Sequence, residues 1–130
     1  MPWTRWLNYS YNQAFTIRDA LKARRLIGSR WYQIRWGPVF QLTGDQNEKK
    51  RYENTKTGFR MASGFGGSVT GERGDRVVID DPLKADEAHS DVALENVNTT
   101  FDEALSNRLS DPDKSAIVIM MQRLAQNAVA

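Results

Sequence analysis

The sequence contains no cysteine and only one histidine, His89, in 130 residues. Without cysteine, the chain has no disulfide scaffold, no thiolate metal site and no cysteine nucleophile. A single histidine excludes a histidine-rich zinc site, and it makes a serine–histidine–aspartate triad depend on one residue. Because a chain without cysteine suits a reducing compartment, we expect a cytoplasmic protein.

Long apolar segments are also missing. No run approaches the ~18 residues that a membrane-spanning helix needs, and the first residues show no apolar core of a secretory signal. Hydrophobic residues make up 40% of the chain and charged residues 26%, which is typical of a folded globular protein. We therefore expect one domain over residues 1–130 and no membrane contact.

The phosphate-binding pattern G-x-x-x-x-G-K-[ST] occurs nowhere in the chain. The nearest glycine-rich segment is 64–74, which holds five glycines. The glycines around Thr70–Asp75 would let backbone N–H groups approach an anion, but their spacing does not match that pattern. A surface loop is the simpler prediction for this segment.

The small net charge of +2 conceals an uneven distribution. Residues 1–60 hold 12 Lys and Arg against 4 Asp and Glu, a balance of +8, whereas residues 61–130 hold 6 against 12, a balance of −6. A basic half can meet phosphate groups and an acidic half can hold a divalent cation. Two halves that simply attract each other would explain the same distribution.

The first half of the chain predicts a strand, a helix and a hairpin. Hydrophobic spacing and turn residues place these elements. We expect a strand at 6–11, a helix at 12–27 that stops at Gly28, a helical turn at 29–37, a strand at 39–43, a turn at 44–47, and hairpin strands at 51–54 and 59–62.

The second half predicts a βαβ unit. Two continuous apolar runs, Arg76–Asp80 and Ala116–Met121, are typical of strands buried on both faces of a parallel sheet. Between them, 86–109 has helical spacing that Asn98–Thr100 interrupts. Strand, helix and strand in this order predict an α/β fold with parallel strands and a right-handed crossover.

The most specific chemical feature is the acidic pair that ends the first of these strands, Asp80 and Asp81, followed by Pro82. Ligands of open parallel sheets bind at the carboxyl ends of the strands. Two adjacent carboxylates repel each other there, and a divalent cation would relieve the repulsion. Asp80 would then hold Mg²⁺ and Asp81 would orient or deprotonate the attacking water. An ordinary turn after a strand is the alternative.

The second apolar strand is followed by Gln122 and Arg123. A polar residue here could sense a γ-phosphate or the attacking water through its amide, and an arginine could bind a phosphate. A surface pair that closes a strand is the alternative.

A basic and aromatic segment over 24–36 contains four arginines: Arg24, Arg25, Arg30 and Arg35. Arginines interleaved with aromatic rings can bind a nucleic acid backbone and stack bases. Alternatively, Trp31, Tyr32, Ile34 and Trp36 pack inside while the arginines face water. His89, without a second histidine or cysteine nearby, is expected to be a solvated helix residue.

Taken together, the residues resemble the large terminase subunit of tailed bacteriophages, the ATP-driven DNA-packaging motor. The resemblance covers about residues 6 to 124 and rests on the order and spacing of the matching segments. The segments are Asn8-Tyr9-Ser10, Arg24-Arg25-Leu26-Ile27, Ser29-Arg30-Trp31-Tyr32-Gln33, Trp36-Gly37, Asp45-Gln46-Asn47-Glu48-Lys49, 54–62 with Gly58 and Arg60, 67–75, Val78-Ile79-Asp80-Asp81-Pro82-Leu83-Lys84, Leu105-Ser106-Asn107-Arg108-Leu109 and Val118-Ile119-Met120-Met121-Gln122-Arg123-Leu124.

The resemblance implies a P-loop-type ATPase domain that uses ATP and Mg²⁺. The strand ending at Asp80 would be its Walker B strand, with Asp80 at the Mg²⁺ position and Asp81 at the catalytic carboxylate position. Gln122 would belong to the motif that couples hydrolysis to movement, and Arg123 would contact the nucleotide. The partners implied are double-stranded viral DNA, the portal protein and the small terminase subunit, in the cytoplasm of an infected bacterium and at the capsid.

This sequence departs from the family in three ways. Asp81 stands where many terminases have Glu, which changes the geometry of water activation. The resemblance begins after the family's phosphate-binding loop and ends before its nuclease domain. We therefore expect a partial ATPase domain whose first βα unit is missing, which does not turn over ATP on its own and which self-associates through the sheet it exposes.

Two other function classes remain open. A non-catalytic module could keep the fold and hold DNA or a packaging subunit through the basic half. A metal-dependent nuclease could use Asp75, Asp80 and Asp81, although nuclease sites usually gather acids from several strands.

Overall fold

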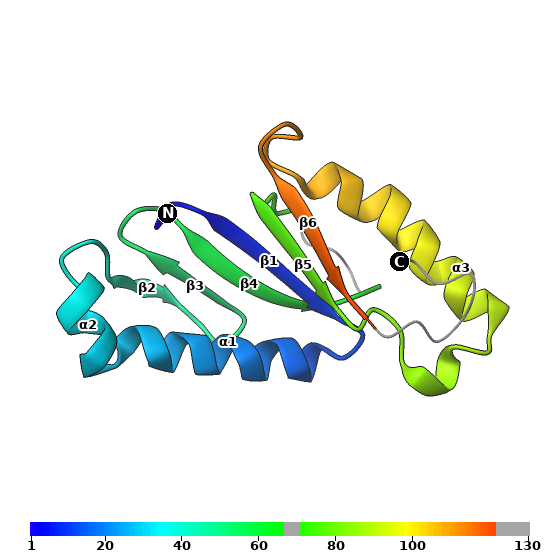
Figure 1. Cartoon of the computed structure of the whole chain (residues 1–130), viewed down its shortest axis with the longest axis horizontal. Coiled ribbons are helices and arrows are strands. Elements are labelled where there is room, and N and C mark those ends of the chain that lie inside the picture. Colours follow the sequence, from blue (N-terminus) through cyan, green and yellow to red (C-terminus); the bar gives the residue numbers. More distant parts are fainter. Residues whose placement is uncertain (67–70, 122–130) are drawn as a thin grey trace.

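The chain folds around one six-stranded mixed sheet with strands in the order β2-β3-β4-β1-β5-β6 (Figure 1). The computed structural model describes residues 1–66 and 71–121. Four neighbouring strands, β4, β1, β5 and β6, run parallel, and β3 is antiparallel to both β2 and β4. The strands are β1 (Arg5–Ser10), β2 (Leu42–Asn47), β3 (Arg51–Asn54), β4 (Phe59–Gly64), β5 (Arg76–Asp80) and β6 (Ala116–Met120).

Helices lie on both faces of the sheet. Those of the first half are α1 (Gln13–Gly28) and α2 (Arg30–Trp36). Those between β5 and β6 are η1 (Ala85–Glu87), α3 (Asp91–Thr99), the π-helical η2 (Thr100–Leu105) and η3 (Ser106–Arg108). The α/β class predicted from the sequence is therefore confirmed, with a mostly parallel sheet and flanking helices. In the described parts of the chain, no helix is long and apolar enough to cross a membrane.

The first helices begin and end at side chains suited to those positions. The Asn12 side-chain oxygen accepts a hydrogen bond from the Ala14 N–H (2.9 Å), which caps the start of α1. Ser29 lies between the helices, where its backbone N–H donates to the Leu26 carbonyl and its hydroxyl accepts from the Tyr32 N–H. This places α2 directly after α1 with a sharp change of direction.

The β3–β4 hairpin forms as predicted, around a turn built by Asn54. The Asn54 side-chain oxygen accepts from the N–H groups of Lys56 and Gly58, and its amide donates to the Pro2 carbonyl oxygen (2.6 Å). A Cβ on Gly58 would lie 2.0 Å from that same Pro2 oxygen. Only glycine fits here without moving the backbone that precedes β1.

The larger core lies on the α3 side of the sheet. It contains Leu7 and Tyr9 of β1, Phe59 and Met61 of β4, Val77 and Ile79 of β5, and Leu105 of η2. A second, smaller core lies on the opposite face, where α1 packs Ala20 against Tyr52 and Ala62. Consecutive residues of β1 therefore point to different layers, with Leu7 and Tyr9 toward η2 and the residues between them toward the α1 side.

Two predictions about strands need correction. The segment 44–47 was predicted to be a turn, but it forms most of β2, and the strand predicted at 39–43 begins only at Leu42. Because β2 is an outer strand paired irregularly with β3, its exposed polar residues need no buried face. Ala116–Met121 was predicted to be a strand buried on both faces, yet in the observed strand, Ala116–Met120, Val118 and Met120 are 44% and 48% exposed. The reason is that β6 is also an outer strand, while α1 contacts β4 and β1.

The other elements agree with the sequence. Helix α1, α2, β1 and β5 appear at the predicted places, and β5 and β6 are parallel neighbours joined through helices. The predicted interruption of the long helix at 98–100 is the change from α3 to η2. The predicted short strand at 68–70 lies outside the described residues.

Candidate functional site

The acidic pair lies at the edge of the sheet where the parallel strands end. Ser10 pairs with Asp80 across β1 and β5, and Asp80 pairs with Met120 across β5 and β6. Only two residues separate the end of β1 from the start of α1, so the first turn of α1 starts at the same edge. The sheet thus places Asp80 between the ends of two neighbouring strands, which is where ligands of open α/β sheets bind.

Asp81 is held in a sharply bent conformation by both neighbouring strands. Its N–H donates to the Met120 carbonyl (2.8 Å), and its carbonyl accepts from the Tyr11 N–H (2.9 Å). Its φ angle is +44°, in the left-handed region that a residue with a side chain enters at a cost of about 1 kcal/mol or more. Two strand contacts therefore fix a strained backbone that turns the chain away from β5 immediately after Asp80.

The electrostatics of the edge favour a bound cation. Partial burial raises the pKa of Asp80, the nearby carboxylates of Asp81 and Asp19 raise it further, and Arg18 opposes them. Arg18 is itself paired with Asp19 at 3.0 Å. Because Asp80 and Asp81 are both exposed, a metal ion could reach them and neutralise their repulsion.

The chain itself offers few metal ligands at this edge. Within residues 1–66 and 71–121, no group of three or more His, Cys, Asp or Glu side chains could hold a metal ion. Mg²⁺ commonly binds through one or two carboxylates, completing its shell with water and phosphate oxygens. The pair fits that mode, and it does not fit a metal site made wholly of protein ligands.

Asp75 does not join the pair, contrary to the three-aspartate arrangement of a nuclease. It precedes β5, whereas Asp80 ends it, so the two are separated by about 16 Å of extended chain. Its carboxylate accepts from the Arg5 backbone N–H (2.9 Å) and guanidinium (3.1 and 3.2 Å). Burial raises the pKa of Asp75, but these hydrogen bonds outweigh it and leave the pKa lowered. Asp75 thus fastens the start of β1 to the start of β5.

The glycine-rich loop preceding β5 contributes a packing contact at Gly74. The Gly74 N–H donates to the Arg108 carbonyl, and its carbonyl accepts from the Ser110 N–H. A Cβ at this position would lie 2.7 Å from the Leu7 side chain. Gly74 therefore allows close contact between the loop and the core, and no anion is needed to explain it.

The predicted nucleic-acid arginines lie at the other end of α1. Arg24 and Arg25 are in its last turns, about 18 Å along the helix from its start. Arg24 donates to the Asn47 carbonyl (2.8 Å), and Arg35 donates to the Trp31 carbonyl (3.1 Å) and lies over its ring. The remaining pair, Arg25 and Arg30, are exposed. The acidic edge and the arginines are therefore two separate places on the molecule.

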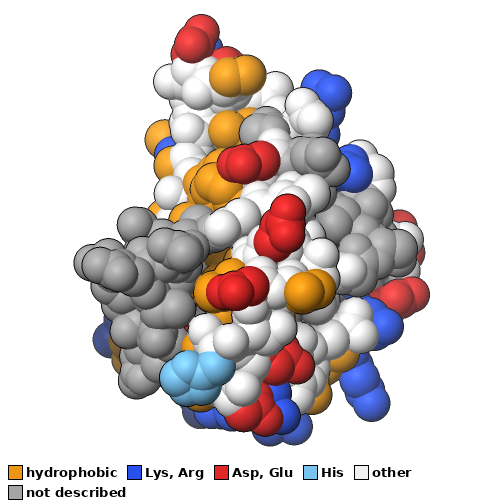
Figure 2. Space-filling view, turned by 90° about the vertical axis from the view of Figure 1, so that its right-hand side faces the viewer, with side chains coloured by type: hydrophobic (Ala, Val, Ile, Leu, Met, Phe, Trp, Pro, Cys, Tyr) orange, Lys and Arg blue, Asp and Glu red, His pale blue; other side chains and the backbone are white. Residues whose placement is uncertain are grey.

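The aromatic residues around these arginines are less buried than a packed segment would require. Trp31 is 54% exposed and Ile34 is 67% exposed, and α2 has no buried residue. The alternative prediction that this segment packs inside is therefore wrong for Trp31, Ile34 and Trp36, which is 39% exposed, while Tyr32 is half-buried. His89 is exposed, as expected, but it lies in the turn between η1 and α3 and in neither helix. Asp and Glu side chains are spread over the face shown in Figure 2.

Gln122 and Arg123 lie outside the described residues, so their predicted roles stay predictions. The preceding strand β6 runs beside β5 in register as far as Met120.

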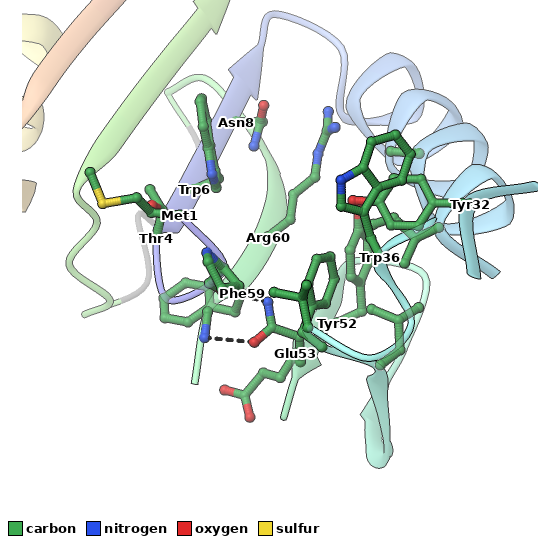
Figure 3. Close-up of a pocket in the computed structure, with 18 residues that line it drawn as sticks. Met1, Thr4, Trp6, Asn8, Tyr32, Trp36, Tyr52, Glu53, Phe59 and Arg60 are labelled. Carbon is green, nitrogen blue, oxygen red and sulfur yellow. Dashed lines mark hydrogen bonds between the residues drawn. The ribbon is translucent and has the colours of Figure 1, made fainter. Parts of the chain in front are cut away.

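Sequence patterns do not reveal a cavity of about 560 Å³ on the α1 side of the sheet (Figure 3). Its walls include Trp6 of β1, Arg60 of β4, Tyr52 of β3, and Tyr32 and Trp36 of α2. These residues are far apart in the sequence and meet only through strand pairing. The one available signal was the density of aromatic and basic residues in the first half of the chain.

A scan against protein-family models finds no match to this sequence, and a search of curated proteins finds no similar one.

Proposed function

We propose that the acidic edge is the Mg²⁺-binding and water-activating part of an ATP hydrolysis site in a DNA-packaging motor of the terminase type. The observation that supports this most is the position of Asp80 and Asp81. They follow a parallel strand that has parallel neighbours on both sides. In P-loop-type ATPases an acidic residue after such a strand holds Mg²⁺ on the nucleotide phosphates.

Each carboxylate has a separate role in this proposal. Asp80 holds Mg²⁺, directly or through water, and the cation would offset the partial burial and the neighbouring carboxylates that raise the pKa of Asp80. Asp81 orients the attacking water from a backbone that both neighbouring strands fix. Gln122 and Arg123 would act on the γ-phosphate from the chain that follows β6.

The phosphates themselves need a loop that these 130 residues do not contain, because the G-x-x-x-x-G-K-[ST] pattern is absent. We propose that another segment or polypeptide supplies it. The outer edge of β6, with exposed Val118 and Met120 beside it, is a place where a further strand could pair. By resemblance, the partners of the complete motor would be viral DNA, the portal protein and the small terminase subunit.

Metal binding by Asp80 and Asp81 is tested with Mn²⁺, which substitutes for Mg²⁺ and is followed by electron paramagnetic resonance. We expect saturable Mn²⁺ binding that Asp80→Asn or Asp81→Asn removes and that Asp113→Asn, an exposed aspartate in a distant turn, leaves unchanged. Equal binding by all four proteins would contradict the metal site.

The need for a separate phosphate-binding loop is tested by measuring ATP hydrolysis. The chain alone should show no turnover, because the groups that position the phosphates are missing. Mg²⁺-dependent hydrolysis by the chain alone that Asp80→Ala abolishes would show that the loop is not needed, and would overturn that part of the proposal.

A binding module is the second candidate, favoured by the exposed Arg25 and Arg30 beside the exposed Trp31. It predicts duplex DNA binding that falls steeply with salt and does not depend on nucleotide. The double variant Arg25→Gln, Arg30→Gln should weaken this binding, and an unchanged affinity would rule out this surface.

A further inference from the structure

The aromatic cavity has a floor made by three neighbouring strands. Trp6 pairs with Arg60 across β1 and β4, and Arg60 pairs with Tyr52 across β4 and β3. Strands are spaced by about 4.8 Å, so these three side chains form a row about 10 Å wide on one face of the sheet. An indole, a guanidinium and a phenol therefore lie side by side at the base of the cavity.

Further aromatic rings form the opposite wall. Tyr32 and Trp36 of α2 have ring centroids 4.7 Å apart, and Phe40 contacts Tyr32 at 6.0 Å. Figure 3 shows the Arg60 side chain rising between Trp6 on one side and these rings on the other, with Asn8 next to Trp6. Trp6 and Trp36 are 42% and 39% exposed, so a ligand can reach both rings.

The polar groups in the cavity favour an anion. Arg60 Nε is buried, and among the described residues it has no hydrogen-bond partner. The lining carboxylate, Glu53, is paired with Arg51 at 2.6 Å, and the Asn54 amide is bonded to Pro2. Arg60 interacts with the Tyr52 phenol, and among the described residues no carboxylate is paired with it, so its positive charge remains for an anionic ligand.

We propose that this cavity binds a nucleotide, with its base against the aromatic rings and its phosphate toward Arg60. A planar base suits walls made of rings, because stacking is strong and tolerant of base identity. The basic balance of residues 1–60 favours the negative phosphate. A volume of about 560 Å³ falls in the usual range of small-molecule sites.

The ligand can come from two sources that share this chemistry, a free mononucleotide or an unpaired base of a single strand. Duplex DNA is a poor ligand, because paired bases are stacked and do not present their faces. The site is distinct from the acidic edge. Trp6 lies four residues before Ser10, which pairs with Asp80, so about 13 Å of strand separates them. Binding here can fail or succeed independently of the proposed ATP hydrolysis site.

The test measures binding of a fluorescent oligothymidylate of about eight nucleotides, a length within the ~4–16 nucleotides of known single-strand sites. Fluorescence anisotropy gives the affinity, with unlabelled thymidine monophosphate and a duplex of the same length as competitors. Trp6→Leu should weaken binding at least about fivefold, the lower end for loss of one base–ring stack. Trp3→Leu is the matched control, since Trp3 is 57% exposed and does not line the cavity.

The competitors distinguish the two sources. Thymidine monophosphate that competes as well as the oligomer would identify a free-nucleotide site, and much stronger competition by the oligomer would identify a single-strand site. Equal weakening by Trp6→Leu and Trp3→Leu, no binding of either ligand, or duplex competing as well as single strand would each overturn the proposal.

A second measurement uses the unmodified protein, so its result does not depend on whether a variant folds. Ultraviolet crosslinking of bound oligothymidylate to the unmodified protein should label the peptides that contain Trp6, Trp36 or Tyr52. Labelling only outside the cavity would overturn the proposal.

Arg60→Gln should weaken binding of the nucleotide more than that of the uncharged nucleoside, and an equal loss for both would contradict the role of Arg60 toward phosphate.

Discussion

Replacing Tyr9 with phenylalanine should stabilise the protein. Tyr9 lies in the middle of β1, in the core under η2, and is 1% exposed. Its hydroxyl is buried, and no residue in the described part of the chain is its hydrogen-bond partner. Burial raises the pKa of this hydroxyl, although nearby Arg108 partly opposes the shift.

The expected size follows from two opposing terms. Removing an unpaired buried hydroxyl recovers its desolvation cost, about 1–3 kcal/mol. The space left by one oxygen, roughly 12 Å³, costs about 0.3 kcal/mol at ~24 cal/mol per Å³. The net gain is about 0.7–2.7 kcal/mol. With ~2.1 cal/mol/K of unfolding entropy per residue, each kcal/mol corresponds to about 4 °C in Tm for a chain of 130 residues.

Urea unfolding followed by circular dichroism measures this gain, and thermal melts check the shift in Tm. Tyr32→Phe is the control, because Tyr32 is only half-buried and its replacement should change stability by less than about 0.5 kcal/mol. A Tyr9→Phe variant that is less stable than the unmodified protein would refute the reasoning, because it would show that the hydroxyl has a partner in solution.

Two further predictions concern stability. Gly58→Ala should cost more than about 2 kcal/mol in urea unfolding, because the new Cβ would meet the Pro2 carbonyl oxygen, while Gly44→Ala, with open space around it, should cost nothing. The aspartates at the two ends of β5, Asp75 before it and Asp80 at its last position, should respond to pH with opposite signs. The folded pKa of Asp80 is raised, so its charged form costs stability, and Asp80→Asn should stabilise the protein near neutral pH, with the gain vanishing below about pH 3.8. The folded pKa of Asp75 is lowered, so Asp75→Asn should destabilise near neutral pH, with a loss that fades as the pH falls below 3.8. The same sign for both variants would contradict these shifts.

Most of the fold could be predicted because its signals are local. Asn12 and Ser29 mark the ends of helices, and the β-branched run of β5 marks a central strand. Predictions failed at the two outer strands, β2 and β6, because the burial of a strand depends on its place in the sheet and on which helix covers it. Local sequence does not contain that information.

The two candidate sites also differ in whether local sequence predicts them. Asp80 and Asp81 stand out in the sequence because both follow one strand, and their position at the sheet edge follows from the parallel topology. The aromatic cavity could not be predicted, since Trp6 and Arg60 become neighbours only through pairing of β1 with β4. The conformation of Asp81 was equally hidden, because two other strands impose it.

The central place of β1 has a consequence for how the protein is made. Strand β1 is an interior strand that pairs with β4 and with β5, and its Ser10 meets Asp80 only 70 residues later. At a synthesis rate of ~5–20 residues per second, the ribosome needs about 4–14 s to add that length. Until β5 is made, the apolar side chains of β1 lack their partners Val77 and Ile79 even after β4 has emerged, so we expect a chaperone to hold the nascent chain until then.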